Sequence, residues 1–287
     1  MQISSVGVVG AGTMGLGIAQ VLLRHGFSVK LHDSHPAARE MAREKISRGL
    51  SREVAKGAWP DSERQAAEDR LSVTGELTQL TSADFVIEAV TEQFDVKGNV
   101  FRSLDSICRP EVIFATNTSS ISITRLAAAT GRPQRFAGMH FFNPVPVMKL
   151  VEVVAGLETS DSTLEAVEGL AKSLGKTPVR IKDSPGFISN RLLMPMINEA
   201  VYAVMEGVTE PRDVDQIMKL GMNHPMGPLE LADFIGLDVC LDIMRVLYEG
   251  FSDSKYRPCP LLERMVSAGW LGRKAGRGFY EYPRTPA

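Results

Sequence analysis

The first thirty-three residues alternate between apolar runs and a turn rich in glycine. An apolar run over residues 5–9 is followed by the turn Gly10-Ala11-Gly12-Thr13-Met14-Gly15, by a segment of helical apolar period over residues 16–25, and by a second apolar run over residues 27–32 that ends at Asp33. Short apolar runs predict buried strands, and the helical period predicts a helix between them. Strand, glycine turn, helix, strand and acid follow one another in the order of a βαβ unit that binds a dinucleotide.

Each glycine of this turn has its own expected task. Gly10 permits the tight turn, Gly12 lets the backbone approach a pyrophosphate, and Gly15 allows the helix to pack close to the strand. The start of the helix then presents N–H groups and the positive end of its dipole to the phosphates. We expect the whole turn to bind the cofactor, through Gly10, Ala11, Gly12, Thr13, Met14 and Gly15. The alternative is a glycine turn that binds nothing.

Asp33 indicates which cofactor the unit prefers. It follows Gly15 at close to the ~20 residues at which an acid accepts hydrogen bonds from the adenosine ribose. A 2′-phosphate would place negative charge against this carboxylate, and the next residues, Ser34 and His35, supply no arginine that offsets it. We therefore expect NAD rather than NADP, with Arg39 as the nearest residue that would overturn this preference.

Three further apolar runs are each followed by polar side chains. The polar residues are Glu92 after residues 83–90, Asn117 and Ser119 after residues 112–116, and His140 after residues 136–139. Because ligands of an open parallel sheet bind outside the carboxyl ends of its strands, we expect these four side chains to share one crevice with the nucleotide. Each of them is alternatively explained as a helix cap or a loop residue.

His140 precedes a second strand-like segment that carries one carboxylate. The sequence Gly138-Met139-His140-Phe141-Phe142-Asn143-Pro144-Val145-Pro146 leads into residues 149–154, which include Glu152. A strand that turns back on its neighbour brings His140 and Glu152 into contact. A carboxylate on one imidazole nitrogen fixes the tautomer and raises the basicity of the other, so that the pair can take a proton from a substrate hydroxyl. The alternative is a core histidine beside an unrelated glutamate.

Residues 37–70 differ from the segments around them because they are rich in Arg, Lys, Glu and Ala. This composition predicts a solvated helical pair inserted into the sheet domain. The pair is either a plain helical hairpin or a basic clamp on an anionic substrate.

A domain boundary is predicted at residues 182–187, where a strand-like segment over residues 177–181 closes the sheet and the pattern becomes helical. Ser184 is expected as the N-cap and Pro185 as the first helical residue. The helical period then predicts four helices: over residues 187–205, after Pro211, over residues 229–248 and over residues 261–268.

The two sides of this boundary are expected to form separate domains. Residues 1–183 would form the sheet domain, and residues 184–287 a helical domain that binds substrate and, through its apolar faces, makes a homodimer. Asn190 lies near the start of the second domain. It is either an exposed helix residue or one that points its amide into the cleft between the domains.

Composition narrows the classes of function. The chain has 287 residues and a formal net charge of −2, which gives no general attraction for nucleic acid or anionic membranes. Its three cysteines are far apart in sequence, no His/Cys cluster indicates a metal, and no apolar run reaches the ~20 residues of a membrane span. An odd, sparse cysteine count suits a reducing compartment. The sequence begins almost directly with a strand, so we expect no signal peptide, and a cytoplasmic protein without a metal, nucleic-acid or membrane partner.

The motifs together resemble those of a known family. In chain order they are the glycine turn, Asn117-Thr118-Ser119-Ser120, the histidine motif, Pro185-Gly186-Phe187-Ile188-Ser189-Asn190-Arg191, Met226-Gly227-Pro228-Leu229-Glu230-Leu231-Ala232-Asp233 and Gly276-Arg277-Gly278-Phe279-Tyr280. Over essentially its whole length the chain resembles the L-3-hydroxyacyl-CoA dehydrogenases, and within them the short bacterial 3-hydroxybutyryl-CoA dehydrogenases. The resemblance implies an α/β fold, with an N-terminal Rossmann-type doubly wound sheet followed by an all-α C-terminal domain. It also implies reversible hydride transfer between NAD and C3 of a short-chain 3-hydroxyacyl-CoA.

The resemblance assigns catalytic roles to four positions. His140 would act as the general base in alcohol oxidation and the general acid in ketone reduction, and Glu152 would orient it and balance its charge. Ser119 and Asn190 would hold the reacting oxygen and the acyl carbonyl of the substrate.

Further positions match cofactor and substrate contacts of the family. Besides the glycine turn and Asp33, the matched cofactor positions are Glu92, Lys97, Asn117, Ser119, Asn143 and Lys274. Lys56 matches a basic residue that reaches the CoA portion of the substrate, which favours the clamp interpretation of residues 37–70. One departure is Gly49, which stands where some members have a serine that touches CoA.

Three other functions are compatible with parts of the pattern. The β-hydroxyacid dehydrogenases share the glycine turn and a helical second domain, but they use a lysine in the interdomain helix, where this chain has Asn190 and Arg191. A sugar-acid dehydrogenase that acts without CoA, such as gulonate 3-dehydrogenase, shares the histidine motif. A non-enzymatic NAD-binding relative is the third alternative, against which the four catalytic positions argue.

Overall fold

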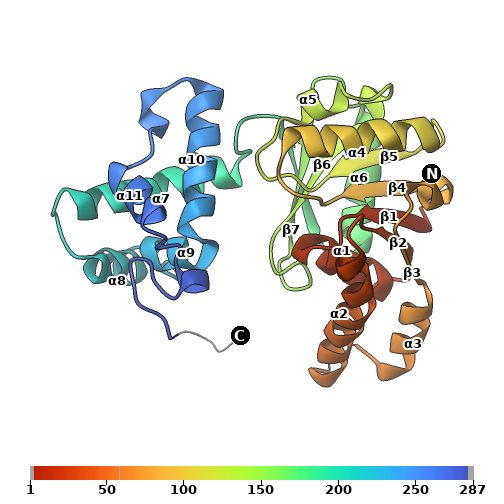
Figure 1. Ribbon diagram of the computed structural model, residues 1–287, viewed down its shortest axis with the longest axis horizontal. Coiled ribbons are helices and arrows are strands. Elements are labelled where there is room, and N and C mark those ends of the chain that lie inside the picture. The colour runs from red at the N-terminus through yellow and green to blue at the C-terminus, as the bar shows by residue number, and fades with distance from the viewer. Residues whose placement is uncertain (1–2, 58, 284–287) are drawn as a thin grey trace. The chain divides into compact units, whose positions relative to one another are not determined.

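The computed structural model describes residues 3–57 and 59–283 (Figure 1). The chain divides after Asp183 into two compact units, Met1–Asp183 and Ser184–Ala287. The first unit is built on a sheet flanked by helices, and the second consists of helices. The predicted fold class is therefore confirmed: a Rossmann-type doubly wound sheet followed by an all-α C-terminal domain.

The sheet of the first unit has eight strands in the order β3-β2-β1-β4-β5-β6-β7-β8. All neighbouring strands are parallel except β6 and β7, which are antiparallel. The central strands are buried on both faces, which explains why their sequences are continuous apolar runs. The strands are β1 Ser5–Val9, β2 Ser28–His32, β3 Leu71–Thr74, β4 Phe85–Glu88, β5 Ile113–Thr116, β6 Phe136–Phe141, β7 Leu150–Ala155 and β8 Thr177–Lys182.

The strand order reverses at β1, which lies between β2 and β4. Right-handed crossovers place the helix after β1 on one face of the sheet and the helix after β4 on the other. A crevice opens at such a reversal, outside the carboxyl ends of the strands. The helices of this unit are α1 Thr13–Arg24, α2 Pro36–Ala55, α3 Asp61–Asp69, α4 Phe94–Ile107, α5 Ile123–Ala127 and α6 Asp161–Ser173, with 3₁₀ turns at Leu77–Ser82 and Pro133–Arg135.

The charged insertion forms the expected pair of helices, α2 and α3, which extend from the sheet in Figure 1. One face of α2 is apolar, because Ala42, Ile46 and Leu50 recur at helical spacing and are buried. The rest of α2 is mostly charged and exposed. The pair is followed by β3, which was missed because its four residues, Leu-Ser-Val-Thr, contain no apolar run.

The second unit packs its helices around one apolar cluster, contributed mainly by α7, α9, α10 and α11. Its helices are α7 Ser189–Met205, α8 Pro211–Gly221, α9 Pro228–Ile235, α10 Leu237–Phe251 and α11 Pro260–Ser267, with 3₁₀ turns at Ser254–Tyr256 and Arg273–Ala275. Among the described residues, none of the helices combines the length and apolar character that a membrane span requires.

Two predicted helix boundaries in this unit are wrong. Residues 229–248 were expected as one helix, but Gly236 has a φ of 108° and separates α9 from α10. Ser184 and Pro185 were expected to begin a helix, but α7 begins at Ser189. Gly186 and Phe187 have φ values of 68° and 53°, and such left-handed residues cannot continue a right-handed helix.

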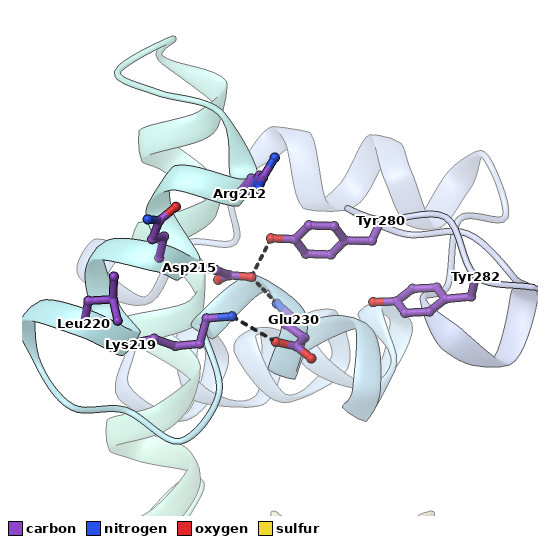
Figure 2. A pocket seen from close by; sticks show the side chains of 8 residues that line it. Arg212, Asp215, Lys219, Leu220, Glu230, Tyr280 and Tyr282 are labelled. Carbon is purple, nitrogen blue, oxygen red and sulfur yellow. Dashed lines mark hydrogen bonds and ion pairs between the residues drawn. The ribbon is translucent and has the colours of Figure 1, made fainter.

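Asp215 of α8 ties the start of α9 to the end of the chain (Figure 2). Its carboxylate accepts the N–H groups of Leu229 and Glu230 and the hydroxyl of Tyr280, the last at 2.6 Å. It thus caps α9 from a distance, because the N-cap residue Gly227 has no side chain to do so. A Cβ at Gly227 would lie 2.3 Å from Asp215, which explains the glycine in this motif. The adjoining pocket, of about 580 Å³, is lined by none of the predicted site residues.

Candidate active site

His140 and Glu152 lie directly opposite each other on the antiparallel strands β6 and β7. Directly opposed residues of such a pair place their side chains on the same face of the sheet. The Nδ1 atom of His140 lies 2.8 Å from the Oε2 atom of Glu152, and both residues are buried. The structure thus contains the contact that the sequence predicted.

This contact determines which imidazole nitrogen is basic. Since the carboxylate of Glu152 accepts a hydrogen bond from Nδ1–H of His140, Nε2 is the nitrogen that carries the lone pair. The ring of Phe142 lies with its centroid 4.6 Å from that of His140 and shields it on one side. The arrangement is that of a general base whose protonated form is stabilised by an adjacent carboxylate.

The glycine turn between β1 and α1 is shaped for a close approach of a ligand to the backbone. Gly10 has a φ of 106°, and a Cβ at Gly15 would lie 1.8 Å from the carbonyl oxygen of Gly10. A Cβ at Gly12, by contrast, would meet no atom within 4 Å. The N-cap residue of α1 is Gly12, which has no side chain to accept the N–H groups at the start of the helix, so they can bind a pyrophosphate.

Asp33, at the end of β2, lines a pocket of about 710 Å³ together with Gly10 and Gly12. Burial raises the pKa of its carboxyl, but hydrogen bonds from the N–H groups of Ala11 and His35, at 2.7 and 2.9 Å, hold the pKa below its ordinary value. Asp33 is therefore an anion. The glycine turn and this carboxylate fit the pyrophosphate and the adenosine ribose of NAD.

Arg39, the residue that would have favoured NADP, is held by backbone groups. Its guanidinium donates to the carbonyl oxygens of Asp33 and Ser34, at 2.8 and 2.9 Å. The ionised Asp33 carboxylate remains in the same pocket. The charge arrangement at this end of β2 thus still favours NAD.

Direct contacts join the polar residues after β4 and β5 to each other and to β6, the strand that contains His140. Glu92 accepts hydrogen bonds from the backbone N–H of Ser119 at 2.8 Å and from its hydroxyl at 3.3 Å. The side-chain oxygen of Asn117 accepts the N–H of Phe141, which adjoins His140, at 2.9 Å. Glu92, Asn117, Ser119 and His140 thus all lie at the carboxyl ends of β4, β5 and β6. The crevice that we expect them to share with the nucleotide stays a prediction.

Lys97 and Glu88 form a buried ion pair behind these residues. The ammonium of Lys97 lies 2.7 Å from Glu88 and 3.2 Å from both Glu92 and the carbonyl oxygen of Val90. The side chains of Glu88 and Lys97 are 0% and 1% exposed. Glu88 was not predicted as a site residue because it stands inside the apolar run of β4, where periodicity does not distinguish a glutamate from its neighbours.

A second depression in the first unit, of about 590 Å³, lies between the glycine turn, the loop that carries Asn143, and α2. The cations that line it are Lys45 and Arg52. Lys56, expected at the CoA portion, follows the end of α2 and is not part of this lining. Gly49 packs against Gln20, since a Cβ at position 49 would lie 2.2 Å from the side-chain oxygen of Gln20.

Two predicted site residues belong to the second unit. Asn190 is the second residue of α7 and is 8% exposed. The ammonium of Lys274 donates to Asp238 at 2.6 Å. Their roles at the site remain predictions.

Comparison with known proteins covers both units. Residues 5–184 match the family model described as 3-hydroxyacyl-CoA dehydrogenase, NAD binding domain, and residues 186–282 match 3-hydroxyacyl-CoA dehydrogenase, C-terminal domain. The chain is 55% identical to a probable 3-hydroxybutyryl-CoA dehydrogenase of Bacillus subtilis, over 98% of each chain. It is 52% identical to the 3-hydroxybutyryl-CoA dehydrogenase of Bradyrhizobium diazoefficiens, over 98% of this chain and 96% of the other.

A solved structure agrees with these relatives. The crystal structure of (S)-3-hydroxybutyryl-CoA dehydrogenase PaaH1 from Ralstonia eutropha superposes with a TM-score of 0.96 and is 50% identical, over 99% of this chain and 100% of the other. The sequence comparisons and the fold comparison therefore agree. The chain belongs to the 3-hydroxyacyl-CoA dehydrogenase family and is an NAD-dependent dehydrogenase.

Proposed function

We propose that the protein catalyses the reversible, NAD-dependent oxidation of 3-hydroxybutyryl-CoA to acetoacetyl-CoA. The observation that carries this proposal is the buried contact of 2.8 Å between His140 and Glu152, which supplies the acid–base group that the reaction requires. Relatives at 55% and 52% identity bear the name of this activity. The glycine turn and the ionised Asp33 supply the groups that would hold NAD.

The proposed mechanism assigns proton transfer to His140. Bound NAD would supply the acceptor for the hydride that leaves C3 of the substrate. His140 takes the hydroxyl proton on Nε2, and Glu152 stabilises the imidazolium that results. A positioned base of this kind typically contributes ~10²–10⁴-fold to the rate. In the reverse direction the same imidazolium returns the proton to the ketone oxygen.

The remaining predicted residues are assigned to binding. Ser119 and Asn190 would hold the reacting oxygen and the acyl carbonyl of the substrate. Asn117 and Asn143 would line the nicotinamide end of the cofactor. Glu92, Lys97 and Lys274 would also contact the cofactor. Because Lys97 is almost fully buried between two glutamates, we assign it to the support of Glu92 as well.

The CoA portion of the substrate would bind along α2. Several arginines near this helix form ion pairs, among them Arg24 with Glu53 and Arg48 with Glu44. Within residues 3–57 and 59–283, Lys45 and Arg52 form no such pair, and both line the 590 Å³ depression. Exposed cations without a carboxylate partner are suited to the phosphates of CoA. Lys56 extends the same row beyond the end of the helix.

The protein is also proposed to be a cytoplasmic homodimer held through its second unit. Of the fourteen exposed large apolar side chains in the described part of the chain, nine belong to the second unit. Such a concentration of exposed apolar surface favours association with another protein surface. All three cysteines are buried free thiols, which suits a reducing compartment.

The substrate is tested by comparing acetoacetyl-CoA with compounds that lack CoA. NADH oxidation is measured with acetoacetyl-CoA and with free acetoacetate, and NAD reduction is measured with gulonate. We expect kcat/KM for acetoacetyl-CoA to exceed that for free acetoacetate by at least about a hundredfold, because remote binding energy contributes to the rate. Equal rates with acetoacetate, or faster turnover of gulonate, would replace the proposal with the CoA-independent alternative.

A further inference from the structure

Glu88 joins the ends of three elements in the first unit. One of its oxygens accepts the N–H of Val90 at 2.6 Å and the ammonium of Lys97 at 2.7 Å, and the other accepts the hydroxyl of Thr116 at 2.7 Å. These donors belong to the loop after β4, to α4 and to the end of β5. Burial raises the pKa of this 0% exposed carboxyl, and the ammonium of Lys97 together with the two other donors opposes that shift. The three donors hold the carboxyl group in one orientation.

Lys97 transmits this restraint to Glu92. Its ammonium lies between the two carboxylates, 2.7 Å from Glu88 and 3.2 Å from Glu92. Glu92 itself is 38% exposed, so burial alone does not fix the position of its side chain. The buried ammonium therefore limits the positions that Glu92 can adopt.

Glu92 in turn organises the loop that carries Ser119. A single oxygen of Glu92 accepts the hydroxyl of Thr118 at 2.5 Å, the N–H of Ser119 at 2.8 Å and the N–H of Ser120 at 3.2 Å. The loop has a second tether, because Thr116 donates to Glu88 and also accepts the N–H of Thr118. Both tethers lead back to the Glu88–Lys97 pair.

We infer that Glu88 is a positioning residue of the dehydrogenase reaction, which acts through Lys97 and Glu92 to hold Ser119 where it contacts the reacting oxygen of the substrate. This inference rests on the proposed function, since that function gives Ser119 its role. Apolar residues at both positions 88 and 97 would fill the core, and a buried ion pair adds little stability over two apolar residues. The pair is explained by the orientation that it gives to Glu92 and Ser119.

A double-mutant cycle tests whether Glu88 acts through Ser119. Glu88→Gln keeps the shape of the side chain and acceptors for Lys97 and Val90, but it removes the charge. We expect it to lower kcat about five- to tenfold in the parent protein and less than about twofold in a Ser119→Ala background. Equal losses in both backgrounds would show that Glu88 does not act through Ser119 and would overturn the inference.

Asp84→Asn is the matched control for general destabilisation. Asp84 lies just before the other end of β4, where it accepts the N–H groups of Ser4 and Ser5 and pairs with Arg109. Loss of the Asp84 charge is expected to lower the melting temperature and to leave kcat within about twofold of the parent value. If Asp84→Asn and Glu88→Gln lowered kcat in the same proportion to their loss of melting temperature, the effect of Glu88 would be a stability effect only.

Hydrogen–deuterium exchange supplies a readout that does not depend on turnover. In the full-length protein without ligands, a peptide that covers residues 117–120 reports the amides of Ser119 and Ser120 that Glu92 binds. Glu88→Gln should speed exchange in this peptide at least about threefold, and Asp84→Asn should not. Unchanged exchange would overturn the inference even if the parent does not accept acetoacetyl-CoA, so its failure is distinguishable from failure of the proposed function.

If the Glu88→Gln protein does not fold, Thr116→Val is the variant that replaces it in these tests. It preserves volume at a buried position and removes the hydroxyl that links Glu88 to the loop. Thr116→Val should lower kcat and speed exchange in the peptide that covers residues 117–120, each by a smaller factor than Glu88→Gln. No change in either measurement would contradict the tether.

Discussion

The chemistry proposed for this protein depends on a few buried side chains whose charges are balanced by near neighbours. His140 reaches Glu152 because β6 and β7 run antiparallel and place the two residues opposite each other. That contact was predictable from sequence, since only a short loop separates two strand-like segments. The Glu88–Lys97 pair was not, because a glutamate in an apolar run has no pattern that names its partner nine residues later.

Asp33 provides a prediction about cofactor choice. Its carboxylate should repel a 2′-phosphate, so steady-state kinetics should show a preference for NADH over NADPH. Asp33→Ser should narrow that preference about tenfold, because it removes a unit charge beside the phosphate. A parent protein that prefers NADPH would contradict the charge argument.

The pH dependence of the same preference follows from the lowered pKa of Asp33. Because hydrogen bonds hold this pKa below 3.8, the carboxylate stays ionised in the folded protein. The stability that these bonds add is present above the unfolded-state pKa and is lost as pH falls through the folded-state value. The ratio of kcat/KM for NADH and NADPH should thus be independent of this group between about pH 5 and pH 8. Loss of the preference near pH 6 would indicate that another group sets it.

At the scale of elements, the sequence predicted helices and strands whose apolar pattern continues over many residues. It did not predict helix boundaries that depend on the backbone angles of single residues. The helical pair α2 and α3, the apolar strands and α7 follow from composition and periodicity. The break at Gly236 and the late start of α7 do not, because Gly236 and Phe187 have positive φ values that are set by tertiary packing.

Two glycines provide a paired prediction about these angles. Gly236→Ala should lower stability by about 1–3 kcal/mol, because alanine is strained at a φ of 108°. Gly169→Ala, within α6, should raise stability by about 0.5–1 kcal/mol, since an added Cβ meets nothing within 4 Å there. Thermal unfolding followed by circular dichroism compares the two. A neutral Gly236→Ala would mean that this conformation is not required.

The insertion α2–α3 provides a prediction about the CoA portion. Lys56→Ala should raise the KM for acetoacetyl-CoA by about two- to fivefold, because an exposed contact between a lysine and a phosphate is weak. The effect should shrink in high salt. Arg52→Ala should act in the same direction, whereas Lys172→Ala, at an exposed position on α6, should have no effect. If Lys56→Ala raised the KM for a truncated thioester without the nucleotide by the same factor, Lys56 would be acting through the fold and not through a contact with CoA.

At the scale of the whole molecule, the chain is a sheet unit that carries the acid–base pair and a helical unit. Among the described residues, the helical unit carries nine of the fourteen large apolar side chains that are exposed. The change of pattern near Ser184 signalled this division, because continuous apolar strands gave way to helical periodicity. The partner of those apolar side chains is not encoded in a local pattern, so association has to be measured.

Light scattering measures association directly. At micromolar concentration the protein should have twice the 31.3 kDa mass of one chain, because burial of apolar surface favours a dimer. A mass of one chain under these conditions would refute the proposed homodimer. Residues 184–287 would then need another partner for their exposed apolar side chains.

The most direct test of the whole account is the rate at which purified His140→Gln oxidises NADH with acetoacetyl-CoA. We expect kcat to fall by ~10²–10⁴-fold, because the side chain that transfers the proton is gone, while NADH binds with nearly unchanged affinity. Glu152→Gln should show a smaller loss, since it weakens the orientation and charge balance of His140 but leaves the base in place. A His140→Gln protein that turns over acetoacetyl-CoA at close to the parent rate would contradict the assignment of His140 as the acid–base group.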